Sequence, residues 1–149
     1  MILQTKNFGE IEVEKSKFIT FESGLLGFEE VKQYVFLSNP DQENPFHWMQ
    51  AIEDPNLAFV ITDPFLFKKD YEFEIPEKVM AELDIAKIED VAVYCIAVVP
   101  ENIRKMTINL RGPLVVNTER KIGKQIVLDG EAYDLKHYIF PDAKENNKG

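Results

Sequence analysis

The sequence predicts a mostly β protein, a small antiparallel β-barrel or β-sandwich that forms a single domain over residues 1–140, with one short α-helix at about 76–84. About nine apolar or alternating stretches have the length of strands, and turn-forming residues separate them. One stretch has apolar residues at helical spacing. The 149 residues have the size of one ordinary domain and can bury a core without disulfide bonds.

The first strands are predicted from strict alternation. In residues 10–14, two apolar side chains alternate with glutamates that face solvent, and these are Glu10, Glu12 and Glu14. Residues 1–6 can pair with this strand through a turn at 7–9. A further strand is expected at 17–21, and it ends at the stretch FESGLLGFE.

Prolines and polar loops delimit the next strands. The stretches 34–37 and 46–52 flank a polar loop with two prolines, which we expect to be exposed. Asp54-Pro55 and Asp63-Pro64 then bound a short strand at 57–62, because proline cannot donate a hydrogen bond to a strand ladder and restricts the residue before it.

The helix at 76–84 is predicted from its first turn and its apolar face. Pro76 suits the first helical position, and Glu77 suits the positive end of the helix dipole. The apolar residues on one face are Val79, Met80 and Leu83.

The C-terminal part of the chain returns to strands. Residues 91–99 are apolar on both faces, which is typical of a central strand. Shorter strands are expected at 107–110, 114–117 and 125–129, with a polar connection before the last one. Residues 141–149 are polar, and we expect a disordered tail there.

Composition narrows the class of function. The formal net charge is −9, and such an acidic surface disfavours direct binding of nucleic acid and favours basic partners. No apolar run reaches the length of a membrane helix, and no signal peptide is apparent, so we expect a cytoplasmic protein without membrane contact. The one cysteine, Cys95, lies in an apolar strand and is expected to be buried.

The sequence marks no catalytic centre, metal site or cofactor site. His47 and His137 lie in no ligand spacing, and the serines lie in no nucleophile elbow. Asp54 and Asp63 could be imagined as an acid and a base, but aspartate before proline is common turn chemistry. Turn chemistry is therefore the better interpretation of these aspartates than catalysis.

The stretch FESGLLGFE at 21–29 can be compared with a phosphate-binding loop. A phosphate cradle needs successive free N–H groups, whereas here two leucines fill the space between the glycines and three glutamates surround it. Glycines that adopt positive φ in a wide turn explain the pattern better. Leu25, Leu26 and Phe28 then either cap the end of the barrel or form an apolar lip that meets a partner.

Several blocks of the chain together resemble the flagellar assembly factor FliW family. These blocks are FESGLLGFEE, EDPNLAFVITDPFLFKKDYEFEIPEKV, VAVYCIAVVPENIRKMTINLRGPLVVN and GKQIVLD, in order over nearly the whole chain. The block around the second Asp-Pro pair is the most specific. The family usually has Gly-Leu-Pro-Gly-Phe where this chain has Leu26 in place of the proline, which loosens the turn.

The resemblance implies a non-enzymatic protein that binds the RNA-binding translational repressor CsrA and also flagellin, in a partner switch that couples flagellin synthesis to export. An acidic face could displace RNA from a basic repressor, while apolar side chains anchor the contact. A solvated strand face explains the acidic stripe at 10–14 better than a partner contact does, whereas core packing and a partner anchor explain the aromatic residues at 65–71 equally well. The candidate partner-binding residues are Glu22, Leu25, Leu26, Phe28, Asp63, Phe65, Phe67, Tyr71, Glu10, Glu12 and Glu14.

Two other classes of function remain alternatives. A barrel with eleven phenylalanines could hold a small apolar ligand, for which a void of several hundred Å³ would be the sign. A carboxylate-based hydrolase would need two acidic side chains that face each other in a cleft, and the sequence marks no such pair.

Overall fold

Seven strands close into a β-barrel in the computed structural model, which describes residues 1–38, 40, 41 and 43–140. The strands of the barrel are β3 (Phe18–Thr20), β4 (Gln33–Leu37), β5 (Phe46–Ala51), β6 (Ala58–Thr62), β7 (Val91–Val98), β9 (Leu114–Asn117) and β10 (Ile122–Gln125). The tail expected to be disordered, at 141–149, lies outside the described residues. The predicted mostly β class is confirmed.

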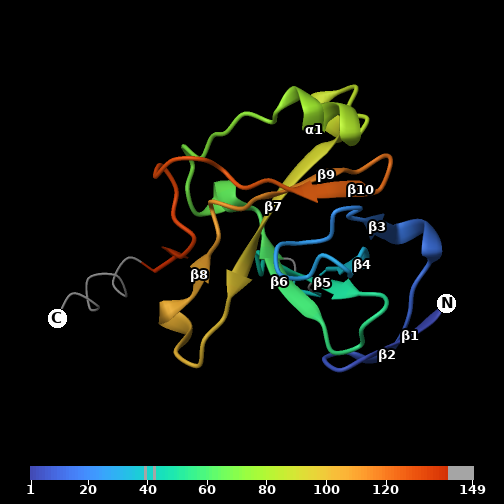
Figure 1. The fold of residues 1–149 in the computed structure, drawn as a ribbon. Coiled ribbons are helices and arrows are strands. Elements are labelled where there is room, and N and C mark those ends of the chain that lie inside the picture. Colours follow the sequence, from blue (N-terminus) through green and yellow to red (C-terminus); the bar gives the residue numbers. More distant parts are fainter. Residues whose placement is uncertain (39, 42, 141–149) are drawn as a thin grey trace.

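The order around the barrel is β7, β6, β5, β4, β3, β10 and β9, and pairing of β9 with β7 closes the ring (Figure 1). All neighbouring strands are antiparallel except β3 and β10, which are parallel and meet at one residue pair, Thr20 with Ile122. The β3–β10 contact is therefore the shortest ladder of the ring.

Alternate residues of these strands fill the barrel interior, together with Phe21 and Leu25 from the chain between β3 and β4. The residues of this core that are buried are Ile19, Phe21, Leu25, Tyr34, Met49, Ala51, Ile61, Leu114 and Val116. The ring of Phe21 lies edge-on to Tyr34, with centroids 5.7 Å apart. Gly123 of β10 is needed beside this ring, because a Cβ atom there would lie 2.6 Å from a carbon of Phe21. Large side chains thus occupy the barrel, and glycine on one strand makes room for them.

Three further units cover the outside of the barrel. The hairpin of β1 (Ile2–Thr5) and β2 (Gly9–Glu12) packs Leu3 and Val13 against Val35 of β4. The helix α1 (Glu77–Glu82) packs against β9 and the chain after β10. The segment after β6, together with β8 (Thr107–Ile108) and β11 (His137–Tyr138), covers the outer face of β7. Short 3₁₀ helices occur at Lys15–Lys17 (η1), Pro64–Leu66 (η2), Ile88–Asp90 (η3) and Ile103–Lys105 (η4).

The predicted helix is confirmed, with Pro76 at its N-cap rather than its first turn. Val79 and Leu83 are buried against Val115 and Ile126, as the apolar face predicted. The helix ends where Asp84 adopts a φ of +51°. α1 therefore serves as a short lid over one side of the barrel.

The strand predicted at 125–129 is wrong in position. The ladder runs over β10, inside the stretch predicted to be a polar connection, and ends at Gln125. The apolar residues that suggested the later strand, Ile126 and Leu128, pack instead against the α1 side of the core. β11 was not predicted, because a two-residue strand carries no periodicity.

Candidate functional site

The stretch at 21–31 forms two successive tight turns after β3. Gly24 has a φ of +66°, and a Cβ atom there would lie 2.5 Å from the backbone of Glu29. Gly27 has a φ of +87°, and the N–H of Phe28 donates to the carbonyl of Leu25 at 2.7 Å. This is a type II turn with Leu26 at its second position, where proline is favoured. The predicted glycine turn is confirmed.

The three apolar residues of this turn have different environments. Leu25 is buried in the barrel core, with 1% of its surface exposed. Leu26 is 70% exposed, and its N–H donates to the Gln125 side chain at 2.8 Å. Phe28 is 41% exposed, and its ring meets the edge of Phe59 at 5.2 Å. Leu25 plugs the barrel, whereas Leu26 and Phe28 form an apolar surface over its end.

Acidic side chains surround this apolar surface. Glu22 and Glu29 are both exposed. Hydrogen bonds from the backbone N–H groups of Glu29 and Gly27 lower the pKa of the Glu29 carboxyl, and the bond from Gly27 measures 3.1 Å. Glu29 is thus held in its charged form close to Leu26 and Phe28, an arrangement that favours a partner with basic residues around an apolar centre.

The second candidate area is the aromatic segment, residues 63–75, which follows β6. The Asp63 carboxylate accepts the N–H of Phe65 at 2.9 Å and so caps η2. Phe65 is 42% exposed. Phe67 is half-buried, and its ring stacks on that of Phe46 with the ring centroids 5.6 Å apart. This segment therefore has both a packed side and an exposed aromatic side chain.

Tyr71 anchors the aromatic segment to the barrel. It is 3% exposed, and its hydroxyl donates to the carbonyl of Leu110 at 2.6 Å. Burial raises the pKa of this phenol well above its ordinary value, so it stays a neutral donor. Its ring contacts Phe65, Phe73 and Tyr133. Tyr71 thus supports Phe65 from beneath and presents little surface of its own.

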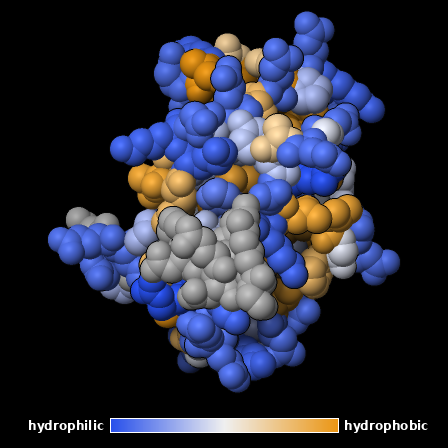
Figure 2. Space-filling view, turned by 90° about the vertical axis from the view of Figure 1, so that its left-hand side faces the viewer, coloured by the Kyte–Doolittle hydropathy of each residue, from blue (hydrophilic) through white to orange (hydrophobic). Residues whose placement is uncertain are grey.

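An apolar groove of about 300 Å³ lies between the aromatic segment and the first half of β7. Its walls are Phe65, Tyr71, Glu72, Phe73, Ile75, Ile88, Val91 and Val93. Ile88 at its rim is 70% exposed. One face of the molecule is shown in Figure 2, where apolar side chains gather in separate small patches divided by hydrophilic ones.

The acidic stripe of β2 lies apart from these surfaces, on the β1–β2 hairpin. Glu10, Glu12 and Glu14 are exposed, as predicted from alternation. Glu10 accepts a hydrogen bond from the Gln4 side chain on β1 at 3.3 Å. The turn at 21–31 and the aromatic segment lie at opposite ends of β6, because Phe28 touches Phe59 near its start and Asp63 follows its last residue. The candidate residues therefore form three areas and not one.

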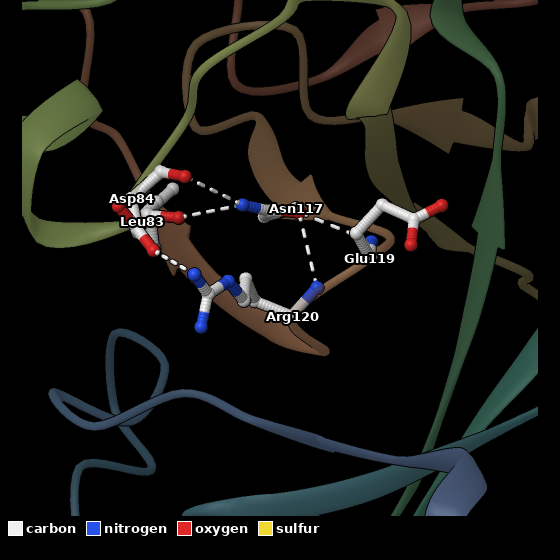
Figure 3. A network of polar contacts seen from close by, with 5 residues as sticks. All are labelled: Leu83, Asp84, Asn117, Glu119 and Arg120. Atoms are coloured by element: carbon white, nitrogen blue, oxygen red, sulfur yellow. Dashed lines mark hydrogen bonds and ion pairs between the residues drawn. The ribbon is translucent and has the colours of Figure 1, made fainter.

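A polar network that the sequence did not mark joins α1 to the turn between β9 and β10 (Figure 3). Asn117 is 2% exposed, and its side-chain N–H groups donate to the carbonyls of Leu83 at 2.8 Å and Asp84 at 3.1 Å. Its oxygen accepts the N–H groups of Glu119 and Arg120 at 3.0 and 3.2 Å. Arg120 also pairs with the Asp84 carboxylate at 2.8 Å. The network fixes the end of the helix against the barrel.

One hollow bears on the alternative of a ligand inside the barrel. It has a volume of about 200 Å³ and is lined by residues of the barrel core, Ile19, Phe36, Tyr94 and Val116, together with Lys17, Thr118 and Lys121. Sites for small ligands usually measure about 300–1,000 Å³. The alternative of an apolar ligand inside the barrel therefore gains no support from this hollow.

Within residues 1–38, 40, 41 and 43–140, no three His, Cys, Asp or Glu side chains gather where they could hold a metal ion. None of the helices in the same residues is long and apolar enough to cross a membrane.

Fold and surfaces define a small closed β-barrel that carries exposed apolar side chains among acidic ones on its outside. Residues 2–139 match the family model described as FliW protein. The chain belongs to the FliW family. It is 56% identical over 145 residues to the flagellar assembly factor FliW of Alkaliphilus metalliredigens (strain QYMF), which covers 97% of this chain and 90% of that protein.

Other relatives agree with this assignment. The flagellar assembly factor FliW of Bacillus subtilis (strain 168) is 40% identical over 139 residues, which cover 93% of this chain and 96% of that protein. A solved structure, described as the crystal structure of the flagellar assembly factor FliW, superimposes with a TM-score of 0.87 at 35% identity, over 95% of this chain and 98% of that one. The barrel architecture is thus shared with a solved member of the family.

Proposed function

We propose that this chain is a non-enzymatic, cytoplasmic flagellar assembly factor that binds two proteins, the RNA-binding translational repressor CsrA and flagellin. Membership in the FliW family over nearly the whole chain carries the proposal. Flagellin and the repressor compete for the chain in this scheme. Export of flagellin then frees the chain to capture the repressor, so that flagellin synthesis follows export.

The apolar surfaces at the two ends of β6 supply anchors for protein partners. Leu26, Phe28 and Phe65 expose 70%, 41% and 42% of their surfaces. Aromatic side chains that become buried at the centre of an interface contribute most of the binding energy. Each surface has rigid support, because Leu25 lies beneath the first and Tyr71 beneath the second.

The charge of the chain suits a partner that binds RNA. Such a repressor is basic where it contacts phosphates. The net charge of −9 and exposed carboxylates such as Glu22 favour encounter with that basic surface. The stripe at Glu10, Glu12 and Glu14 is the candidate contact on β2 and the residues after it. If reversal of these three charges leaves the affinity for the repressor at low salt unchanged, the stripe is not part of the interface.

The test is a titration of a complex between the repressor and its RNA with the purified chain, followed by addition of flagellin, with RNA release and rebinding as the readouts. RNA is expected to be released on the first addition and rebound on the second. Binding of neither protein would refute the proposal.

Two variants and one control sharpen this titration. Leu26→Asp and Phe65→Ala each alter one exposed anchor, and we expect at least one of the two partner affinities to fall by about tenfold or more for each. Ile103→Asp is the matched control, because Ile103 is 56% exposed and lies in η4, outside both areas. Equal loss in the control would show that the effect is unspecific.

A further inference from the structure

β7 extends beyond the end of β6 and so has a free edge. The ladder between them covers Val60 with Ala97, Ile61 with Ile96 and Thr62 with Cys95, and it stops there. On its other side, β7 is paired with β9 from Val91 onward. Figure 1 shows the first half of β7 running past the end of β6 toward α1. Residues 91–94 therefore have a strand on one side only.

The hydrogen bonds of β7 establish which backbone groups are unpaired. The carbonyl of Ile96 accepts the N–H of Asn109, at 2.9 Å, and the carbonyl of Asp90 accepts the N–H of Thr118, at 2.8 Å. Even-numbered residues thus direct their backbone groups toward β8 and β9, and odd-numbered residues direct theirs toward β6. Val93 faces the side on which β6 has already ended, and its N–H and C=O have no partner among the described residues, whereas the N–H of Val91 donates to the carbonyl of Ile88.

The Asp63-Pro64 pair explains why β6 leaves this edge unpaired. If the ladder continued in register, Pro64 would lie opposite Val93. Proline has no N–H to offer. Its carbonyl is also engaged, because it accepts the N–H groups of Phe67 and Lys68 at 3.1 and 3.0 Å within the η2 region. The chain therefore turns away, and the apolar groove takes the place of a strand.

The groove and the free edge adjoin each other. Val91 and Val93 form one wall of the groove, and Phe65 and Phe73 belong to the aromatic segment across from them. A residue that paired with Val93 would place its side chain on the same face of the sheet as the Val93 side chain, which is the groove face. Backbone pairing and side-chain burial are thus available to one extended segment at once.

The charges beside the groove determine the chemistry of that segment. Glu72 belongs to its wall, and Glu74 and Glu89 are exposed neighbours of other wall residues. No ion pair to these three is found in the described part of the chain. Lys68 and Asp70 in the same segment neutralise each other at 3.2 Å. Two exposed lysines, Lys69 in this segment and Lys87 before Ile88, offset part of the charge of the three carboxylates. The carboxylates are still in excess, which favours lysine or arginine on the partner.

We propose that an extended segment of a partner protein, with apolar residues at alternate positions and lysine or arginine at its ends, adds as a strand beside Val91–Val93. Strand addition of this kind obtains affinity from main-chain bonds and specificity from pockets for alternate side chains. This site is distinct from the surface at Leu26 and Phe28, and it goes beyond the proposed function because it does not depend on which protein supplies the segment.

Amide hydrogen exchange of the free protein tests the open edge. The N–H of Val93 is expected to exchange about 100-fold faster or more than those of Ala92 and Tyr94, which are paired with β9. Exchange of Val93 as slow as that of its two neighbours would overturn the proposal, because the edge would then be occupied, by a second copy of the chain or by its own segment.

A designed peptide tests the binding itself. The probe is Lys-Val-Thr-Val-Thr-Val-Lys with blocked ends, added to the isotope-labelled protein up to millimolar concentration and followed by amide NMR shifts. Shifts centred on Val91–Val93 and slower exchange at Val93 are expected. Methylation of the central valine nitrogen should abolish binding, because that nitrogen faces β7, whereas methylation of a threonine nitrogen should leave it. Absence of shifts, or equal binding by the two methylated peptides, would overturn the proposal.

Three variants of the protein complete the test. Val93→Pro removes an N–H that donates to nothing in the fold, so the variant is expected to fold and to bind the peptide about tenfold more weakly or worse. Val93→Ala keeps the N–H, and its affinity for the peptide should fall by about threefold at most. Ala92→Pro removes a ladder donor and should unfold the protein. If Val93→Pro binds the peptide as tightly as the parent, the proposed site is refuted. If that variant does not fold, the comparison of the two methylated peptides decides whether the site exists.

Discussion

The adjacent residues Leu25 and Leu26 give the sharpest prediction. Leu25 is 1% exposed within the barrel core, whereas Leu26 is 70% exposed. Truncation of a fully buried leucine to alanine removes its transfer free energy and leaves a cavity, which together cost about 2–5 kcal/mol. The same truncation at an exposed position costs about 0.5 kcal/mol or less. Leu25→Ala should therefore destabilise the fold strongly and Leu26→Ala hardly at all.

Urea unfolding measures both variants on one scale. The single tryptophan, Trp48, lies in β5 and reports tertiary structure by fluorescence, while circular dichroism reports the strands. Coincident transitions by the two probes would support two-state unfolding. Leu25→Ala should unfold at a lower urea concentration than the parent. The slope of the free energy of unfolding against urea should stay unchanged, since the surface exposed on unfolding remains nearly the same.

The function of the turn is tested with the charged counterpart of each change. Leu26→Asp should leave the free energy of unfolding within about 1 kcal/mol of the parent, while it weakens a partner. Leu25→Asp buries a charge without a partner and should prevent folding. The reasoning is refuted if Leu25→Ala costs less than about 1 kcal/mol, or if Leu26→Ala costs as much as Leu25→Ala.

Three further predictions concern stability. Asn117→Ala should lower the free energy of unfolding, measured in urea, by about 2–4 kcal/mol, because the buried carbonyl of Leu83 loses its hydrogen-bond donor. Arg120→Ala breaks only an exposed ion pair and should lower it by less than about 1 kcal/mol. Similar losses in the two variants would contradict this order. Gly24→Ala should lower the thermal midpoint far more than Gly130→Ala, because both have positive φ but only Gly24 has backbone within 2.5 Å of the new methyl group. Burial raises the pKa of the Cys95 thiol to about 12, so its stabilising contribution is complete below the unfolded pKa of about 8.5 and is lost as the pH rises from there toward 12. The free energy of unfolding should fall over that range, and Cys95→Ala should fall less steeply; parallel curves would show that Cys95 is not the source.

Strand positions were predictable wherever alternation and turn residues agreed. β5, β6 and β9 lie within a residue or so of the stretches marked by their sequence. β10 was not recognised, because its residues Gly123 and Lys124 look like a connection. The need for glycine there comes from the Phe21 ring, which lies 102 positions earlier in the chain. Such a constraint becomes visible only when the barrel has closed.

The candidate surfaces were predictable as stretches but not as single residues. The glycines at 24 and 27 indicated a turn with positive φ, and the turn is present. Which leucine between them faces the core depends on the direction of the chain at that turn, and a sequence without periodicity carries no such information. Asn117 illustrates the same limit, since its partners at Leu83 and Asp84 are more than thirty positions away.

The proline of the second Asp-Pro pair links the most specific block of the sequence to the open edge of the barrel. β6 ends at Thr62, the residue of its last ladder pair with β7. Asp63 then caps the 3₁₀ helix that begins at Pro64 and leads the chain away from β7. A residue with an N–H at position 64 could extend the ladder and donate to the carbonyl of Val93. That extension would require η2 to unwind and would displace Phe65 from its contact with Tyr71. The same proline therefore keeps the aromatic segment folded and keeps the β7 edge free, so that the groove and the unpaired backbone exist together.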